Sequence, residues 1–194
     1  MTPARSATVA EVLAWYAAHA RPLPWRDQDA SGWGVMVSEF MLQQTPVARV
    51  LPVWQTWLAR WPSPSALAAE EPGEAVRAWG RLGYPRRAQR LHAAACAIVA
   101  HHGGEVPTDH DALLALPGVG EYTAAVIASF AFGARHLVLD TNVRRVLARV
   151  EAGQEFPADH LTRAERGRAW EWVPEQPGRA AAWAAASMEL GALV

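Results

Sequence analysis

The feature that most constrains the fold of this chain is a glycine-rich turn, Leu116-Pro117-Gly118-Val119-Gly120, between two segments of helical character. Glycine tolerates positive φ and has no side chain, so this turn can be tight and can present backbone N–H groups. A helix that begins at about Glu121 adds its own unpaired N–H groups and the positive end of its dipole. Helix, turn and helix therefore predict an anion site, and a nucleic-acid backbone is the anion we expect there.

Apolar residues recur at helical spacing through nearly the whole chain, which predicts an all-α fold of about nine to eleven helices without an internal repeat. Only Leu137-Val138-Leu139 resembles a strand, and it is too short and unpaired to form a sheet. We expect Ser65 and Thr108 to cap two of the helices. The expected helices span 9–20, 34–61 with breaks near Pro46 and Pro52, 66–69, 74–81, 86–101, 109–116, 122–132, 142–150, 161–173 and 179–190.

Composition limits the chemistry that the chain can perform. The formal net charge is -1, so any attraction to nucleic acid must come from local clusters of charge. All 18 basic residues are arginine, and the absence of lysine excludes a Schiff base with a sugar or carbonyl. Cys96 is the only cysteine, which excludes an internal disulfide, and we expect it to be a core residue. No signal-peptide pattern or long apolar run occurs, so we expect a cytoplasmic protein that does not contact membranes.

Two carboxylates stand in mostly apolar or uncharged surroundings, Glu39 and Asp140. Burial of a carboxyl raises its pKa, which suits a general acid at neutral pH. A second, ionised carboxylate could stabilise a cationic transition state, as in the cleavage of glycosidic bonds. Simpler interpretations remain open, because Glu39 could face solvent from a helix and Asp140 could be only an N-cap.

Arginines gather around one aromatic residue, Tyr84, and predict a surface that follows a phosphate backbone. These arginines could equally be ordinary solvent-exposed residues. Among the ten tryptophans, which we expect mostly in the core, Trp25 lies in an extended, proline-flanked segment and is the one most suited to face a ligand. Gln43-Gln44-Thr45 offers uncharged hydrogen-bonding groups, suited to reading bases or to ending a helix. The arginines concerned are Arg81, Arg86, Arg87 and Arg90.

Five motifs occur in a fixed order along the chain: Leu-Pro-Trp-Arg at 23–26, Ser-Glu-Phe-Met-Leu-Gln-Gln-Thr at 38–45, Gly-Arg-Leu-Gly-Tyr at 80–84, Leu-Pro-Gly-Val-Gly-Glu-Tyr-Thr-Ala at 116–124 and Leu-Asp-Thr-Asn-Val-Arg-Arg-Val at 139–146. Together they resemble the MutY-type adenine DNA glycosylases, which belong to the helix-hairpin-helix superfamily with endonuclease III. The resemblance is collinear from about residue 9 to residue 194. Bifunctional lyases of this superfamily carry a lysine two residues after the glycine hairpin, where this chain has Tyr122, so no efficient lyase step is expected.

The resemblance implies a role for each residue singled out above. Glu39 would protonate adenine at N7 and later act as the base for water, and Asp140 would stabilise the oxocarbenium-like sugar. Tyr122 would lie beside that sugar and Asn142 would support Asp140. Substrate contacts are implied for Trp25, Arg26, Leu42, Gln44, Thr45 and Met188. Contacts to the DNA backbone are implied for Gly118, Val119, Gly120, Tyr84, Arg86 and Arg87.

The resemblance also implies a domain arrangement and a cofactor. Residues 28–136 would form a six-helix barrel module, and residues 1–27 with 137–194 a second helical lobe, with a central cleft between them. In the family the next residues carry the cysteines of a [4Fe-4S] cluster, so the cluster loop and the C-terminal 8-oxoguanine recognition domain are missing here, and we expect no metal in this chain. The hairpin of this superfamily often binds a monovalent cation.

The expected activity is hydrolysis of the glycosidic bond of adenine opposite 8-oxoguanine or guanine in double-stranded DNA, by a monomer associated with a bacterial nucleoid. The target base would be flipped out of the duplex. Two alternatives stay open: a thymine or uracil mismatch glycosylase of the same superfamily, and a catalytically impaired DNA-binding fragment.

Overall fold

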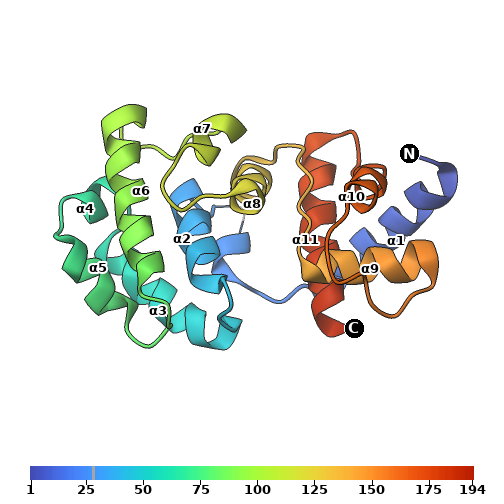
Figure 1. Ribbon diagram of the computed structural model, residues 1–194, viewed down its shortest axis with the longest axis horizontal. Helices are drawn as coiled ribbons and strands as arrows, with labels where there is room; N and C mark the ends of the chain where they lie inside the picture. Colours follow the sequence, from blue (N-terminus) through green and yellow to red (C-terminus); the bar gives the residue numbers. More distant parts are fainter. Residues whose placement is uncertain (28) are drawn as a thin grey trace. The chain divides into compact units, whose positions relative to one another are not determined.

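The computed structural model describes residues 1–27 and 29–194, and these residues are all-helical (Figure 1). The predicted fold class is thus confirmed for the described residues, with a helix number at the upper end of the expected range. The α-helices are α1 (Pro3–His19), α2 (Gly32–Leu42), α3 (Val47–Arg60), α4 (Pro64–Ala68), α5 (Pro72–Trp79), α6 (Arg86–His102), α7 (His110–Leu114), α8 (Glu121–Phe132), α9 (Thr141–Ala152), α10 (Arg163–Trp170) and α11 (Pro177–Leu193), and a 3₁₀ helix, η1, spans Pro24–Arg26.

The chain forms two compact units. Unit 1 consists of Met1–Pro22 and Ala128–Val194, and unit 2 is Leu23–Ile127. Both boundaries come earlier in the chain than the sequence-based boundaries at 28 and 136, and residue 28 itself lies outside the described residues. Unit 2 contains η1, α2 to α7 and the first part of α8, whereas unit 1 contains α1 and the helices from α9 onward.

Helix α2 is the central element of unit 2, because every residue from Trp33 to Met41 is buried. It contacts α3, α6 and η1, and α6 also contacts α4 and α5 (Figure 1). The indole of Trp54 donates a hydrogen bond to the carbonyl of Gly34 at 2.8 Å, and the indole of Trp33 donates to the carbonyl of Trp61 at 2.9 Å. The tryptophans therefore join α2 to α3 through both apolar contact and hydrogen bonds.

Helix α11 organises unit 1 through its contacts with α1 and α9. A buried apolar cluster lies among these helices and α10, and its members are Val9, Val143, Leu147, Ala169, Trp172 and Trp183. The guanidinium of Arg21 donates to both carboxylate oxygens of the buried Glu189, at 2.5 and 2.7 Å. This bidentate pair ties the segment after α1 to α11 and satisfies a carboxylate that would otherwise be costly to bury.

Several local predictions differ from the structure. Pro52 does not break α3, because it lies in an exposed part of the helix where water can replace the one hydrogen bond lost at Ala48. The N-cap of α4 is Ser63 rather than Ser65, since Pro64 fits the first helical position.

Two further predictions concern a cap and a core position. The N-cap of α7 is Asp109 rather than Thr108, and its carboxylate accepts the amide of Ala112 at 2.9 Å. Cys96 is exposed, not core, because the buried face of α6 at this level is formed by Ala94, Ala95 and Ile98.

Gly191 permits the close approach of α11 to the start of α9. A Cβ atom placed on Gly191 would lie 2.1 Å from the carbonyl oxygen of Asn142, and backbone atoms cannot move aside cheaply. Gly191→Ala should therefore lower the free energy of unfolding by about 1–3 kcal/mol, as overpacking does. Urea denaturation measures this, with Gly178→Ala in the same helix as the control. No atom lies within 4 Å of a Cβ at Gly178, so equal destabilisation by both changes would contradict the prediction.

Candidate active site

Glu39 lies in the middle of the buried helix α2 and is 8 % exposed. The helix begins at Ser31, whose hydroxyl accepts the amide of Gly34 at 3.0 Å. The apolar composition of α2 draws the whole helix into unit 2, and Glu39 is carried in with it. The alternative in which Glu39 faces solvent is wrong, and a buried carboxyl is available for proton transfer.

The glycine hairpin packs against two helices of unit 2. Gly118 has φ of +80°, and a Cβ there would lie 2.8 Å from Cβ of Arg90 in α6 and 3.1 Å from Cε1 of Phe40 in α2. Glycine at this position is therefore required both by the backbone conformation and by the space available. The hairpin, α6 and the helix of Glu39 meet at this point.

The amides of the hairpin differ in what they can bind. The amide of Val119 donates to the carbonyl of Leu116 at 3.1 Å, and the residue is buried, so its predicted phosphate contact through that amide is wrong. Gly118 and Gly120 are exposed, and the backbone hydrogen bonds of the described residues do not use their amides. These two amides, with the first turn of α8, form the part of the hairpin that can receive an anion.

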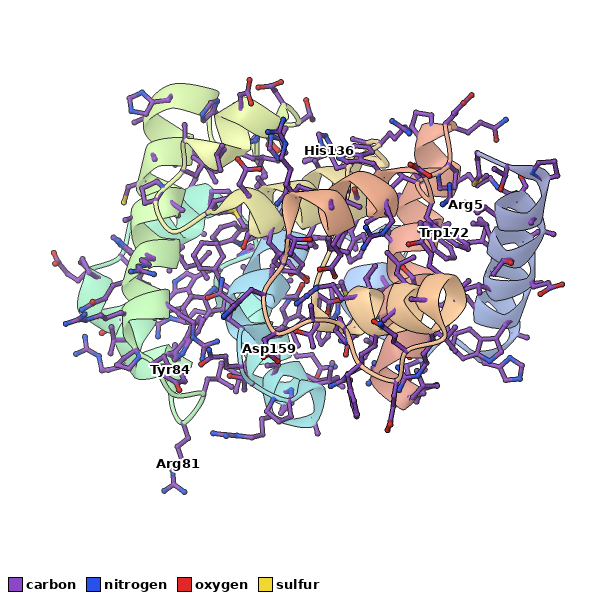
Figure 2. The ribbon with its side chains drawn as sticks, turned by 45° about the vertical axis from the view of Figure 1, so that its right-hand side comes forward. Arg5, Arg81, Tyr84, His136, Asp159 and Trp172 are labelled. Carbon is purple, nitrogen blue, oxygen red and sulfur yellow. The ribbon has the colours of Figure 1, made fainter. Side chains whose placement is uncertain are left out.

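Exposed arginines and one exposed tyrosine lie together in unit 2. Tyr84 is 64 % exposed, and Figure 2 shows it at the surface near Arg81, whose side chain extends away from the ribbon. Arg86 and Arg90 are also exposed, at the start of α6. Arg87 is different: it is 6 % exposed and its guanidinium donates to oxygens inside the unit, so its predicted place on the DNA-facing surface is wrong.

The turn after α2 contains three of the predicted substrate-binding residues. Gln44 is exposed and has φ of 57°, and Leu42 is half-buried. Thr45 is buried, and its hydroxyl donates to the carbonyl of Leu82 at 3.2 Å. Thr45 therefore holds this turn in place, and Gln44 is the residue that the turn presents to solvent.

Three other predicted substrate contacts lie in different surroundings. Trp25 is 4 % exposed and packs edge-to-face on Trp54, with 5.5 Å between ring centroids, so it belongs to the core of unit 2. Arg26, at the end of η1, is half-buried. Met188 is partly buried and packs against the apolar cluster of unit 1.

Asp140 is the N-cap of α9 in unit 1, as the sequence predicted. One carboxylate oxygen accepts the amide of Val143 at 2.7 Å, and the other accepts the side-chain amide of Asn142 at 3.0 Å. The guanidinium of Arg145 donates to Oδ1 of Asn142 at 3.3 Å and to the carbonyl of Gly191 at 3.2 Å. The order Gly191, Arg145, Asn142 and Asp140 thus orients the carboxylate from α11.

The environment of Asp140 opposes its ionisation overall. Desolvation by burial raises the pKa of this carboxyl above its ordinary value of 3.8, while the Val143 amide, Asn142 and the charge of Arg145 partly offset the rise. A partly desolvated carboxylate with fixed donors interacts more strongly with a nearby cation than one in water does. Asp140 is therefore suited to stabilise positive charge on a substrate.

Metal ligands are scarce in the described residues. No group of three or more His, Cys, Asp or Glu side chains in residues 1–27 and 29–194 could hold a metal ion. A [4Fe-4S] cluster requires four cysteine thiolates, and the chain offers only the exposed Cys96. The residues of this chain do not fit the cluster that its resemblance implied.

The catalytic candidates divide between the two units: Glu39 and Tyr122 belong to unit 2, and Asp140 and Asn142 to unit 1. Tyr122 is 37 % exposed in the first turn of α8. Sequence reasoning missed the support that Arg145 gives to Asn142, although the spacing of three residues on one helix could have indicated it.

Comparison with known proteins gives one family match and several relatives. Residues 37–174 match the model described as HhH-GPD superfamily base excision DNA repair protein. The chain is 51 % identical over 185 residues to an adenine DNA glycosylase of Mycolicibacterium smegmatis, covering 95 % of this chain and 62 % of the relative. It is 46 % identical over 200 residues to an adenine DNA glycosylase of Mycobacterium tuberculosis, covering 100 % and 64 %. The chain thus spans under two thirds of the length of these relatives.

A thymine-DNA glycosylase of Aeropyrum pernix is 36 % identical over 141 residues, which cover 72 % of this chain and 63 % of that protein. Among solved structures, a thermostable thymine-DNA glycosylase has a TM-score of 0.84 at 24 % identity, covering 98 % of this chain and 87 % of that one. A non-covalent endonuclease III–DNA complex has a TM-score of 0.76 at 21 % identity, covering 94 % and 82 %. At these identities the two structures speak for a shared fold.

The raised pKa of Asp140 predicts a pH-dependent effect of Asp140→Asn on stability. A carboxyl whose pKa is raised by folding contributes stability below its ordinary pKa, and this contribution is lost as the pH rises through its folded-state pKa. Asparagine caps a helix as well as aspartate but does not ionise. The free energy of unfolding of the variant relative to wild type should therefore increase as the pH rises from below 3.8.

Urea denaturation at a series of pH values measures this difference. Asp109→Asn, at the exposed N-cap of α7, is the matched control for the loss of a capping carboxylate. A relative stability of Asp140→Asn that falls with rising pH would contradict the assignment of Asp140 as a destabilised carboxylate.

Proposed function

The chain belongs to the HhH-GPD superfamily of base excision DNA repair proteins, and from this membership we propose that it carries the catalytic residues of an adenine DNA glycosylase. The observation that supports the substrate most directly is 46–51 % identity to adenine DNA glycosylases over almost the whole chain. Its all-α fold is that of the superfamily. The proposed substrate is a duplex with adenine opposite 8-oxoguanine or guanine.

Glu39 is the proposed general acid. Cleavage of the bond between adenine and deoxyribose leaves electrons on the base, and protonation at N7 makes adenine a better leaving group. A buried carboxyl group in a rigid helix keeps its proton away from bulk water until a base is bound. After the base departs, the same group, now ionised, can accept a proton from the attacking water.

Asp140 is the proposed stabiliser of the sugar cation that forms as the bond breaks. Both of its oxygens are fixed by hydrogen bonds, so no reorganisation is needed when positive charge develops on the sugar. Asn142 keeps Asp140 oriented, and Tyr122 is the residue proposed to lie beside the sugar. Because the chain has no lysine, the reaction is proposed to end with hydrolysis, without a lyase step.

DNA binding is proposed for the arginine-rich surface of unit 2 and for the hairpin. Arg81, Arg86 and Arg90 are exposed, and Arg90 lies directly against Gly118 in the hairpin. Guanidinium groups and backbone amides can then contact successive phosphates, with Tyr84 available to stack on a base. A monovalent cation at the hairpin would add positive charge there, and no step of the proposal depends on it.

A second candidate is a thymine mismatch glycosylase, which the relative from Aeropyrum pernix supports at lower identity and over a smaller part of the chain. The two candidates share the helix-hairpin-helix fold and differ in the base removed. None of the described helices has the length and apolar character needed to cross a membrane. We propose that the protein acts as a monomer on chromosomal DNA.

A panel of duplexes distinguishes the candidates. Single-turnover reactions on duplexes with adenine opposite 8-oxoguanine, adenine opposite guanine, and thymine or uracil opposite guanine should release adenine alone, detected as alkali-labile strands. Adenine release should exceed thymine release by at least about 100-fold, the scale of discrimination by a shaped pocket. The full-length adenine DNA glycosylase of Mycolicibacterium smegmatis serves as the positive control. Preferential release of thymine would favour the second candidate, and tight duplex binding without any release would indicate a DNA-binding protein.

Glu39→Gln tests the proposed acid. The amide is nearly isosteric but cannot give up a proton, so adenine release should fall by about 10²–10⁴-fold, the usual contribution of a general acid. Duplex affinity, measured by fluorescence anisotropy, should stay within about threefold, since the phosphate contacts are unchanged. A single-turnover rate equal to that of the wild type would exclude Glu39 from the chemistry.

A further inference from the structure

The buried guanidinium of Arg87 joins two surface turns of unit 2 that are far apart in sequence. Arg87 comes from the first turn of α6 and is 6 % exposed. Its hydrogen bonds reach the end of α2 on one side and the turn before Tyr84 on the other. No carboxylate partner is recorded for this guanidinium among the described residues, so an ion pair does not explain its burial.

The two terminal nitrogens of Arg87 have different tasks. Nη1 donates to the last carbonyls of α2, those of Phe40 at 3.1 Å, Met41 at 3.0 Å and Gln43. Helix α2 has no side-chain or glycine cap at this end, so these carbonyls would otherwise lack partners.

Nη2 completes the connection to the other turn. It donates to the hydroxyl of Thr45 at 3.0 Å and to the carbonyls of Leu82 at 3.2 Å and Gly83 at 3.1 Å. The planar fork of arginine can serve both turns at once, whereas a lysine ammonium is a single point with three donors.

Both turns hold a non-glycine residue in the left-handed region. Within the described residues Gln44, with φ of 57°, and Tyr84, with φ of 47°, are the non-glycine residues with positive φ. Each is adjacent to groups that Arg87 holds: Gln44 lies between Gln43 and Thr45, and Tyr84 follows Gly83. Such conformations persist where surrounding contacts determine them, and they concentrate at functional sites.

Gln44 and Tyr84 are also the residues that these turns present outward. Gln44 is exposed, and Tyr84 is 64 % exposed, with its ring centroid 5.5 Å from the Arg87 guanidinium carbon (Figure 2). The same guanidinium lies 5.3 Å from the ring centroid of Trp79 in the core. The exposed side chains are thus polar or aromatic, and the groups behind them are locked in place.

We propose that Arg87 is a positioning residue that locks the turn at Gln44 and the turn at Tyr84 into one rigid surface, which enters the duplex and unstacks the base to be removed. This inference rests on the proposed function for its target, but its structural basis lies within unit 2 alone. Because Arg87 is buried, its effect passes through the two turns and not through a phosphate contact. Its loss should therefore impair unstacking and catalysis more than affinity.

The test compares Arg87→Lys and Arg87→Met with the wild type on a duplex with 2-aminopurine next to a mispaired adenine. The fluorescence rise at saturating protein measures unstacking, single-turnover release at saturating protein measures catalysis, and anisotropy measures affinity. Hydrogen exchange of residues 43–46 and 82–86 reports directly on the two turns. Arg77→Met is the control, since Arg77 is exposed and its guanidinium pairs with Glu74 on the surface of α5. Arg86→Met provides the pattern expected from the loss of a phosphate contact, namely weaker binding with a smaller salt dependence.

In Arg87→Lys the fluorescence rise and the rate of release should each fall about tenfold or more, the scale of a small misplacement of reacting groups. The dissociation constant should rise by less than about threefold, because the exposed arginines remain. Exchange of the two turns should accelerate while the core of α6 stays protected. Arg87→Met should lose more, and if it does not fold, Arg87→Lys decides, measured at a temperature where circular dichroism shows it fully folded.

Two results would overturn the inference: unstacking, release and turn exchange within about twofold of wild type, or a change in affinity alone like that of Arg86→Met. Failure of the proposed function has a different signature. If the wild type releases no adenine, the unstacking and exchange measurements still decide the role of Arg87. If the wild type binds no duplex, faster exchange of both turns in Arg87→Lys supports the locking step and removes the duplex as its target.

Discussion

The backbone groups at helix ends, which have no partner inside the helix, are the constraint on which the candidate site depends. At the start of α9 the orphan amides are satisfied by Asp140, and at the end of α2 the orphan carbonyls are satisfied by Arg87. In both places the side chain that completes the helix also fixes groups that can meet a substrate. The structural need for a cap therefore sets the geometry of the chemistry, because neither side chain can rotate without exposing a buried backbone group.

The same arrangement creates a conflict between stability and function. Burial raises the pKa of Asp140, so the ionised form that could stabilise a cation is maintained at a cost in folding free energy. The compensating contacts come from α11, because Arg145 reaches both Asn142 and the carbonyl of Gly191. The close packing that Gly191 permits is thus part of the support of the carboxylate, and the core of unit 1 contributes to the site through it.

How much the sequence could predict depended on whether a feature was local. The all-α class, Asp140 as an N-cap and the glycine hairpin follow from patterns within a few residues, and they were predicted correctly. The caps of α4 and α7 were missed by one or two positions, since several Ser, Thr and Asp residues compete there. The burial of Arg87 and Thr45 could not be predicted, because the oxygens that surround them come from segments about 40 residues away. An arginine beside a tyrosine looks the same in sequence whether it faces solvent or a helix end.

The hairpin illustrates how a motif can carry two meanings. Its glycines suggested a phosphate-binding turn, yet Gly118 is equally demanded by packing, since a side chain there would meet Arg90 and Phe40. The amide of Val119 is used within the turn, so the anion site is narrower than the motif implies. What remains is the pair of exposed glycine amides and the first turn of α8, with Arg90 alongside. Because that arginine is held by the same contact that requires glycine, packing and phosphate recognition are one constraint on this turn, and a substitution at Gly118 would disturb both together.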